Sequence, residues 1–459
     1  MQAFLMRSQR VPYSWAYAIF GPMENRGERN QSSVADGFSS HRLNQRWWHS
    51  LPFIVITAFL LRLAVITVGH TYRITPNRDH FQFGWEMGRL ARSIALDRGF
   101  GSPTDLSTGP SAWAPPVYPY ILAGIFKIFG IYSNASAWMI LAFNSTFGAL
   151  TCATIYSTAR KMYGISVARA ASWTWALFPY AIYWPVRVVW EASLSAFLLS
   201  LVLLITLRMP DQSPKPQIWI GFGVLWGFLA LTNTALISML PLFLGWLLYR
   251  LQWKRQQMMG ACLCLVMTAL TISPWIARNY STFGKFVFIR DNLSLELYLA
   301  NNDRSSGLWT RSQHPGNDPE AMQQFHDLGE IAFMEQKSRQ FREFIREQPG
   351  KFVVFTLERA AYFWIGTPQN ATIGKHNFLP LRHLAYFLSS ALSFIGLWLT
   401  LRSRRSGAFL LACLLLLYPL PYYLVNPFPR YKHPIEPVLI MLIVYAIYMR
   451  RRSENTVNS

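Results

Sequence analysis

The stretch that decides the fold runs from residue 51 to residue 70 and reads LPFIVITAFLLRLAVITVGH. A helix of about 20 mostly apolar residues is long enough to cross the hydrocarbon core of a bilayer. One charged side chain, Arg62, lies near the middle of this stretch. A charge at that depth is unfavourable unless it pairs or reaches the interface, so it marks a functional site by default. We therefore expect a transmembrane helix that carries a candidate functional arginine.

Apolar runs of similar length recur along the chain. Hydrophobic residues make up 52% of the 459 residues and charged residues only 14%, whereas an average soluble domain has about 25% charged residues. The four cysteines are too few to build a disulfide-stabilised domain. We expect an all-α polytopic membrane protein, a bundle of about ten transmembrane helices. The further spans are expected at 134–158, 166–187, 190–208, 217–234, 235–251, 259–277, 382–401, 407–426 and 433–449.

Positive charge orients this bundle. The formal net charge is +21, from 43 Lys and Arg against 22 Asp and Glu. Lys and Arg beside spans mark the cytoplasmic side, and the chain alternates consistently when every cluster is placed inside. We then expect a multi-pass protein of the inner (plasma) membrane with both termini cytoplasmic. We expect no secretory signal peptide and no role for nucleic acid. The clusters are the N-terminal arm, Arg160 with Lys161, Arg208 with Lys215, Arg250 to Arg255, Arg402 to Arg405, and Arg450 to Arg452.

Two long segments fall on the outer, periplasmic side in this topology. In the first, 71–133, apolar residues at helical spacing predict a short helix over 83–96. The proline-rich apolar run 115–132 would invert the later clusters if it crossed, so we expect it to lie in the outer interface. The full division is a cytoplasmic basic arm at 1–50, a membrane core at 51–277 that includes the outer loop 71–133, an outer segment at 278–381, C-terminal transmembrane helices at 382–449 and a cytoplasmic tail at 450–459.

Acids and cations on the outer side are the candidates for chemistry. Acids are scarce there, and a carboxylate facing a groove between helices can act as a general base. The candidate acids are Asp79, Glu86 and Glu191. Cations held at the outer leaflet suit a lipid phosphate. The candidate cations are Arg187, Arg278, Arg430, Lys432 and His433, with Arg62 from the first span.

Several short motifs follow one another on the same side of the expected membrane. They are the stretch Asp79 to Glu86, ARSIALDRGF at 91–100, PPVYP at 115–119, IFG at 128–130, PVRVVWE at 185–191, SPWIARNYSTFG at 273–284 and RYKHPIEP at 430–437. In this order they resemble the GT-C class of integral-membrane glycosyltransferases. The nearest family is that of protein O-mannosyltransferases and of transferases that move aminoarabinose onto lipid A (glycosyltransferase family 39). The resemblance spreads from about residue 55 to residue 440 and adds Tyr118 to the substrate-binding candidates.

The resemblance implies an inverting transfer of a sugar from a polyprenyl-phosphate donor to a lipid, glycan or protein acceptor on the outer face. Outer cations would stabilise the leaving phosphate and a loop carboxylate would take the acceptor proton. The family usually has Asp, often followed by Glu, as the loop acid, whereas Asp79 is followed by His80. Both Asp79 and Glu86 therefore stay open as the catalytic base, with Glu86 favoured because its short helix fixes its direction.

No cofactor is expected and no metal ligand is assigned, although some members of this broad class use a divalent metal. The alternative functions are a polysaccharide polymerase or ligase and a lipid-linked sugar transporter. A transporter predicts an internal repeat and polar residues deep in several spans, whereas the two halves of the sequence show no repeat and deep charge is nearly confined to Arg62. A polymerase or ligase generally has its dominant outer loop late in the chain, whereas the loop at 71–133 is early and bears acids.

Overall fold

The computed structural model describes residues 50–457, apart from residues 105, 213 and 369–378. Within these ranges the chain is helical, and the single β pairing is an isolated bridge between Gly101 and Pro110. The expected basic arm at 1–50 lies outside the described residues except for Ser50.

Six helices of the described chain are long and apolar enough to cross a membrane. Every expected span coincides with one helix or with two consecutive shorter ones, and the number of crossings stays a prediction. The six helices are α2 (Leu51–Val68), α6 (Asn134–Tyr163), α9 (Ala192–Arg208, continued by η2, Met209–Asp211), α12 (Arg255–Phe283), α17 (Leu379–Arg402) and α20 (Glu436–Val457). The shorter apolar elements are α5 (Val117–Phe129), α10 (Pro216–Thr232), η3 (Thr234–Met239), α11 (Leu240–Arg250), α18 (Ala408–Leu417) and α19 (Leu420–Leu424).

The span expected at 166–187 is broken into α7 (Ile165–Leu177) and α8 (Pro179–Arg187). Pro179 begins α8, and proline is tolerated in a first turn but cannot continue a helix. The break leaves backbone carbonyls that need hydrogen-bond donors. Arg62 supplies donors there, because its guanidinium donates at 3.2 Å to the carbonyl of Ala176 at the end of α7 and at 3.4 Å to that of Ala181, which Pro185 leaves without an N–H partner. The buried charge in α2 therefore joins that helix to the break.

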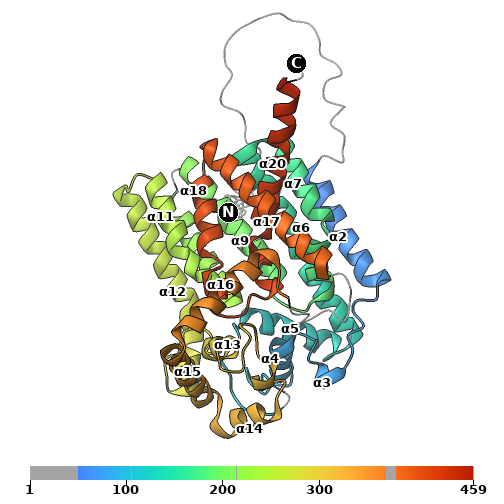
Figure 1. The fold of residues 1–459 in the computed structure, drawn as a ribbon, viewed down its shortest axis with the longest axis vertical. Helices are drawn as coiled ribbons and strands as arrows, with labels where there is room; N and C mark the ends of the chain where they lie inside the picture. Colours follow the sequence, from blue (N-terminus) through green and yellow to red (C-terminus); the bar gives the residue numbers. More distant parts are fainter. Residues whose placement is uncertain (1–49, 105, 213, 369–378, 458–459) are drawn as a thin grey trace, which may run out of the picture. The chain divides into compact units, whose positions relative to one another are not determined.

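The remaining helices gather at one end of the bundle, while the C-terminal part of α20 extends from the other end (Figure 1). Two of these helices follow each other directly in the chain, over Pro319–Leu328 and Glu330–Glu347, and Gly329 with φ 74° separates them. The elements at this end are α3 (Asn77–His80), α4 (Trp85–Ala95), α13 (Leu293–Ala300), η4 (Arg311–Gln313), α14 (Pro319–Leu328), α15 (Glu330–Glu347), α16 (Pro349–Ile365), η5 (Pro429–Tyr431) and η6 (His433–Ile435).

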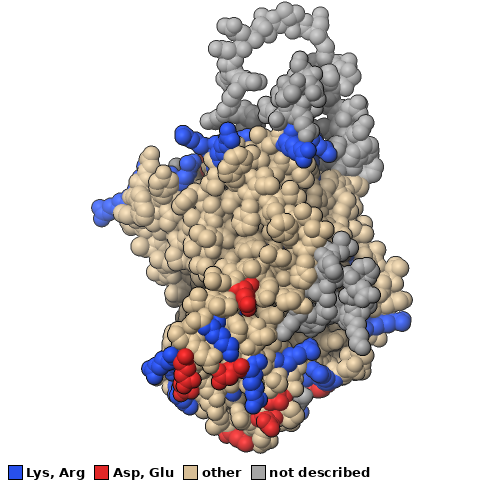
Figure 2. Space-filling model, in the orientation of Figure 1, with Lys and Arg blue, Asp and Glu red and all other residues tan. Residues whose placement is uncertain are grey.

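Charge is distributed unevenly over the described surface. Figure 2 shows a broad belt without charged side chains across the middle of the bundle, with Lys and Arg at both ends. The acidic side chains visible in that view lie toward the end that holds α13 to α15. An uncharged belt flanked by polar ends is the surface that suits a lipid bilayer.

A second apolar core holds α4 against the bundle. Phe83, Met87 and Leu90 are almost fully buried in a cluster with α5 and α6, as their helical spacing predicts. Because this face of α4 packs inward, Glu86 on another face is directed away from the cluster. The expected helix over 83–96 is thus confirmed, and its packing fixes the direction of its acid.

Candidate active site

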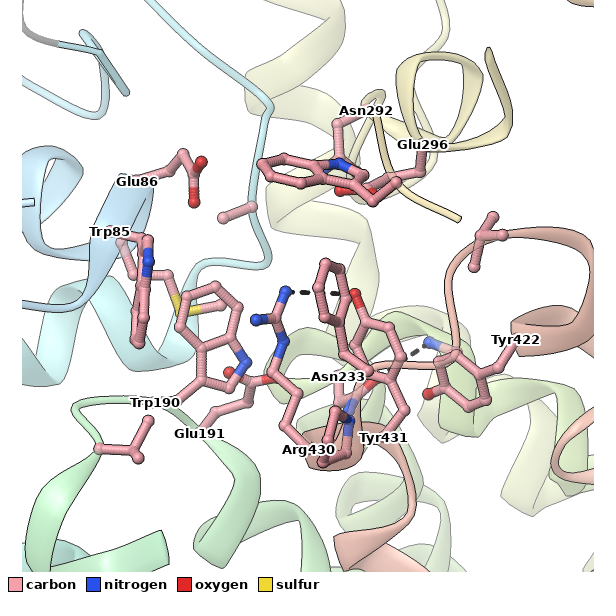
Figure 3. Close-up of a pocket in the computed structure, with 18 of the residues that line it drawn as sticks. Trp85, Glu86, Trp190, Glu191, Asn233, Asn292, Glu296, Tyr422, Arg430 and Tyr431 are labelled. Atoms are coloured by element: carbon pink, nitrogen blue, oxygen red, sulfur yellow. Dashed lines mark hydrogen bonds between the residues drawn. The ribbon is translucent and has the colours of Figure 1, made fainter. Parts of the chain in front are cut away.

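A cavity of about 510 Å³ lies where several parts of the chain meet, at the end of the bundle that holds α4 and α13. Its volume is within the range of small-molecule sites. Figure 3 shows its polar and aromatic wall. The residues labelled there are Trp85, Glu86, Trp190, Glu191, Asn233, Asn292, Glu296, Tyr422, Arg430 and Tyr431.

Glu86 enters this wall from the first turn of α4. The preceding Gly84 has φ 104°, and a Cβ there would lie 3.1 Å from the backbone nitrogen of Gly88 and 3.2 Å from Val189. Glycine therefore permits the tight turn that starts the helix. An acid in a first turn also interacts favourably with the helix dipole.

His314 is the nearest ionisable partner of Glu86. Its Nε2 lies 3.6 Å from Oε1 of Glu86, and its Nδ1 accepts a hydrogen bond from the backbone N–H of Gly316 at 3.0 Å. Burial lowers the pKa of His314 to about 4, so the ring is neutral at pH 7. Since Nδ1 accepts, the single ring proton is on Nε2 and faces Glu86.

Burial raises the pKa of Glu86, and the backbone hydrogen bond and Arg430 oppose this shift only in part. A carboxyl with a raised pKa takes a proton more readily once ionised, which suits a general base.

Two further glutamates face the same cavity. Burial raises the pKa of Glu191, at the start of α9, to about 7. Burial also raises the pKa of Glu296 in α13, and the charge of Glu86 contributes to that shift. In the described chain, Oε2 of each of these two carboxyls is buried without a hydrogen-bond partner. Buried polar atoms without partners are uncommon and need an explanation, such as a missing ligand.

Two arginines bring positive charge to this cavity. The guanidinium of Arg430 lies 4.5 Å from the ring centre of Trp190, and it donates to the Tyr431 hydroxyl at 3.3 Å. Arg290 donates from Nε to Oδ1 of Asn292 at 2.5 Å. Neither arginine has a carboxylate within 4.0 Å in the described residues. Planar guanidinium groups that no carboxylate neutralises suit an oxyanion such as phosphate. No three His, Cys, Asp or Glu side chains in the described part of the chain are grouped so as to hold a metal ion.

The structure brings three sequence-predicted residues into the cavity wall, namely Glu86, Glu191 and Arg430. Asp79, the alternative base, lies outside it and is ion-paired with Arg92 at 2.6 Å.

Arg187, Arg278 and Tyr118 also lie outside the cavity wall. Arg187 is exposed at the end of α8. The guanidinium of Arg278 donates to the carbonyls of Phe100 at 2.8 Å and Ser111 at 2.7 Å, which fastens the first outer loop to α12.

Tyr118 does not line the cavity but is connected to its wall by hydrogen bonds. Its hydroxyl donates to Oδ1 of Asn144 at 3.1 Å, and the amide of Asn144 donates to the carbonyl of Val188 at 3.3 Å. This chain of hydrogen bonds ties α5 and α6 to the backbone just before Trp190 and Glu191.

Lys432 and His433 are buried and do not line the cavity themselves. The Lys432 ammonium donates to Ser390 at 2.9 Å and lies 4.8 Å from the ring centre of Tyr386, which lines the cavity. His433 is hydrogen-bonded to Glu436 at 2.6 Å. Both residues therefore stabilise the turn that carries Arg430.

Sequence reasoning missed several members of the wall. They are Asn233, Arg290, Asn292, Glu296 and His314. One signal was available for Glu296, which is the only charged residue in LSLELYLA, the sequence of α13. An acid in an otherwise apolar helix is unfavourable unless it faces a polar site.

Comparison with protein families gives one match. Residues 114–277, less than half of the chain, match the family model of dolichyl-phosphate-mannose-protein mannosyltransferases. This match confirms the resemblance to that family in the matched residues, which include Glu191 but neither Glu86 nor Arg430. No curated protein sequence matches the chain significantly.

Solved structures share the fold at low sequence identity. The oligosaccharyltransferase AglB from Archaeoglobus fulgidus, in complex with an inhibitory peptide and a dolichol-phosphate, matches with a TM-score of 0.51 and 14% identity over 90% of this chain and 52% of that chain. The apo form of the same enzyme gives the same values. ArnT from Cupriavidus metallidurans, bound to undecaprenyl phosphate, has a TM-score of 0.37 and 15% identity over 87% of this chain and 78% of its own.

The chain thus spans about half the length of the archaeal oligosaccharyltransferases that it matches. Their likeness confirms the expected fold class, an all-α GT-C-like bundle.

Proposed function

We propose that this protein is a membrane glycosyltransferase that moves a sugar from a polyprenyl-phosphate donor to an acceptor, with inversion at the anomeric carbon. The observation that carries the proposal is the cavity itself, in which Glu86, Glu191 and Glu296 surround Arg430, an arginine with no carboxylate within 4.0 Å among the described residues. The family match at 114–277 and the fold shared with a dolichol-phosphate-bound oligosaccharyltransferase support the same class of donor.

In the proposed reaction, the acceptor oxygen or nitrogen attacks the anomeric carbon, and the bond from that carbon to the phosphate oxygen breaks. The polyprenyl phosphate leaves with the bonding electron pair and gains negative charge. Arg430 and Arg290 would stabilise that charge, because preorganised cations act strongly in a site that excludes water. The leaving phosphate needs no strong acid.

Glu86 is the proposed base that takes the acceptor proton. It is ionisable, mostly buried (14% of its side chain is exposed) and faces the cavity, whereas Asp79 is held by Arg92 outside the wall. Glu191 and Glu296 would accept hydrogen bonds from the sugar hydroxyls, which accounts for their unpartnered oxygens. Transfer would take place on the outer face, since α4 and α13, which carry Glu86 and Glu296 of the cavity wall, lie at the end opposite the α20 C-terminus that we expect to be cytoplasmic (Figure 1).

The test is transfer of a radiolabelled sugar from its polyprenyl-phosphate carrier by the purified full-length protein in detergent. Glu86→Gln should lower turnover by about 100-fold or more, because a positioned general base contributes about 10²–10⁴-fold. Binding of the donor should persist in this variant. The matched control is Asp97→Asn, which alters an exposed carboxylate of the same loop that pairs with Lys127.

Near wild-type turnover by both Glu86→Gln and Asp79→Asn would show that neither loop acid is the base. Loss of turnover in Asp79→Asn alone would assign the role of general base to Asp79. Because the positive charge of the proposed site comes from arginine, turnover should also persist in EDTA. Abolition by EDTA with recovery on adding a divalent cation would contradict this part of the proposal.

A further inference from the structure

A second cavity, of about 430 Å³, lies among α13, α14 and α15. We call it the outer pocket, and none of its lining residues belongs to the wall of the proposed active site. Carboxylates, amides and hydroxyls dominate this lining, in contrast to most small-molecule sites, which are mainly apolar. The lining residues used below are Tyr298, Asp303, Gln313, Glu320, Lys337, Gln340, Glu343 and Glu347.

Hydrogen-bond donors and acceptors lie at the buried side of the outer pocket. Lys337 is only 4% exposed, and its ammonium lies 4.6 Å from the ring centre of Tyr298. It donates to the amide oxygen of Gln340 at 3.2 Å and has no carboxylate within 4.0 Å in the described chain. The amide oxygen of Gln313 is buried without a hydrogen-bond partner among the described residues. A buried ammonium has three N–H donors, so this side of the pocket can donate to and accept from a ligand.

The rim of the outer pocket is mainly acidic. Asp303, Glu320, Glu343 and Glu347 are exposed side chains in the lining, against one exposed cation, Arg304. Carboxylates accept hydrogen bonds only, and two oxygens on each group allow several at once.

The chemistry of the two sides restricts the ligand. A polyanion would be repelled by the acidic rim, and a polycation would meet the buried ammonium of Lys337. A hydroxyl group both donates and accepts, so a polyhydroxylated ligand satisfies Lys337 at the buried side and the carboxylates at the rim. We propose that the outer pocket binds a neutral glycan through Lys337, Gln313 and the rim carboxylates.

The two cavities share a wall. Gln313 lines the outer pocket while the next residue, His314, lines the active-site cavity. In α13, Tyr298 faces the outer pocket and Glu296 faces the active-site cavity. A glycan in the outer pocket therefore lies beside the proposed base. This inference rests on the proposed function, because it names a glycan as the acceptor that is held there.

Binding to the purified full-length protein in detergent tests the proposal without requiring turnover. The probes are neutral tetrasaccharides of glucose, mannose, galactose and N-acetylglucosamine, with a tetralysine peptide and a sulfated tetrasaccharide as charged counterparts. Saturation-transfer NMR detects binding, and titration calorimetry measures the affinity. We expect at least one neutral tetrasaccharide to bind and both charged probes to fail.

Lys337→Met removes the ammonium but keeps the length of the side chain, and it should weaken glycan binding about tenfold, the effect of losing one buried hydrogen bond. Glu343→Ala alters an exposed rim residue, so it tests the site even if Lys337→Met does not fold. The matched control on the same helix is Glu335→Gln, whose carboxylate pairs with Lys285 outside the pocket. Glu335→Gln should bind the glycan as the wild type does.

Three results would overturn the proposal: no neutral tetrasaccharide binds, glycan binding is unchanged in both Lys337→Met and Glu343→Ala, or the tetralysine peptide binds instead. The last result would assign the pocket to a cationic ligand. Glu86→Gln separates this proposal from the proposed function, because it should keep glycan binding while it loses sugar transfer. Glycan binding by a protein that transfers no sugar would leave the pocket assigned and the transferase rejected.

Discussion

Glu86 and His314 form the part of the site in which the proton positions are best defined. Gly316 donates to one ring nitrogen of His314, so the other nitrogen carries the proton toward Glu86. A donor aimed at a carboxylate stabilises its ionised form and lowers its pKa. His314 is therefore a positioning residue, which acts on the reaction through the orientation and the pKa of Glu86.

His314→Phe should change the pH dependence of sugar transfer. Loss of the Nε2–H donor raises the pKa of Glu86 further, so the acidic limb of the pH–rate profile should move to higher pH. At a pH below that limb, turnover should fall about tenfold for each unit of pKa shift. His314→Gln keeps an N–H donor and should restore the profile in part. The measurement is turnover against pH for the wild type and both variants. An equal loss of turnover at every pH in His314→Phe would indicate a merely structural role.

The residue-scale comparison with the sequence shows which side chains could be predicted. Glu86 could be, because helical spacing of apolar neighbours fixed the direction of its helix. Arg290 and His314 could not, because they are distant from Glu86 in the chain and meet it only through the folding of the outer segment.

At the scale of elements, a buried pair of carboxyls joins three segments. Oε1 of Glu330, the first residue of α15, accepts the N–H of Ala112 from the first outer loop. The backbone N–H of Asp291 donates to the carbonyl of Ala112 at 3.1 Å. Both carboxyl oxygens of Asp291, and Oε2 of Glu330, are buried without a hydrogen-bond partner among the described residues. Burial raises the pKa of both groups, and for Glu330 the charge of Asp291 adds to the shift. Keeping these carboxyls protonated therefore avoids two buried negative charges at this junction.

The sign of the resulting pH dependence follows from the raised pKa values. The ordinary pKa values are 3.8 for Asp and 4.5 for Glu. The pair contributes its full stability below these values, and that stability is lost as the pH rises through the raised pKa of each group. Glu330→Gln keeps an oxygen for Ala112 and cannot ionise. We therefore expect Glu330→Gln to melt at a higher temperature than the wild type at pH 8, because the wild type must ionise a buried carboxyl there or keep it protonated at a cost in stability.

Thermal melting of the detergent-solubilised protein at pH 5 and pH 8 measures this difference. The gain of Glu330→Gln should shrink at pH 5, where the wild-type pair keeps its proton. Glu335→Gln, which changes an exposed acid of the same helix, should melt as the wild type does at both pH values. A Glu330→Gln protein less stable than wild type at pH 8 would contradict the raised pKa of Glu330.

The sequence predicted the positions of the helices better than the breaks within them. Apolar runs located the helices, yet hydrophobicity continues through the break at Phe178 and Pro179. This break is stabilised by a tertiary partner, the Arg62 guanidinium at the end of α7. A partner from another helix leaves no local signal in the sequence, so the break could not be placed from periodicity.

At the scale of the whole molecule, the composition predicted the fold class because a bilayer imposes the same length and polarity on every span. The orientation of the bundle in the membrane is less constrained by the structure, because the helices pack in the same way whichever end faces the cytoplasm. The evidence for the orientation is the distribution of cations. The turn between α11 and α12 carries Lys254 and Arg255, and the acids gather toward the opposite end at α13 to α15 (Figure 2).

Cysteine labelling in sealed, right-side-out membrane vesicles tests this orientation. Gln323→Cys is exposed on α14 and should react with a membrane-impermeant maleimide, because we expect that end to be outside. Lys254→Cys is exposed in the turn before α12 and should react only after the vesicles are opened with detergent. Both variants are made in a chain carrying Cys262→Ala, since that cysteine is exposed. The reverse pattern would put the candidate active site on the cytoplasmic face, where a donor made in the cytoplasm would reach it without crossing the membrane. Labelling therefore decides whether the polyprenyl-phosphate sugar must be flipped before it is used.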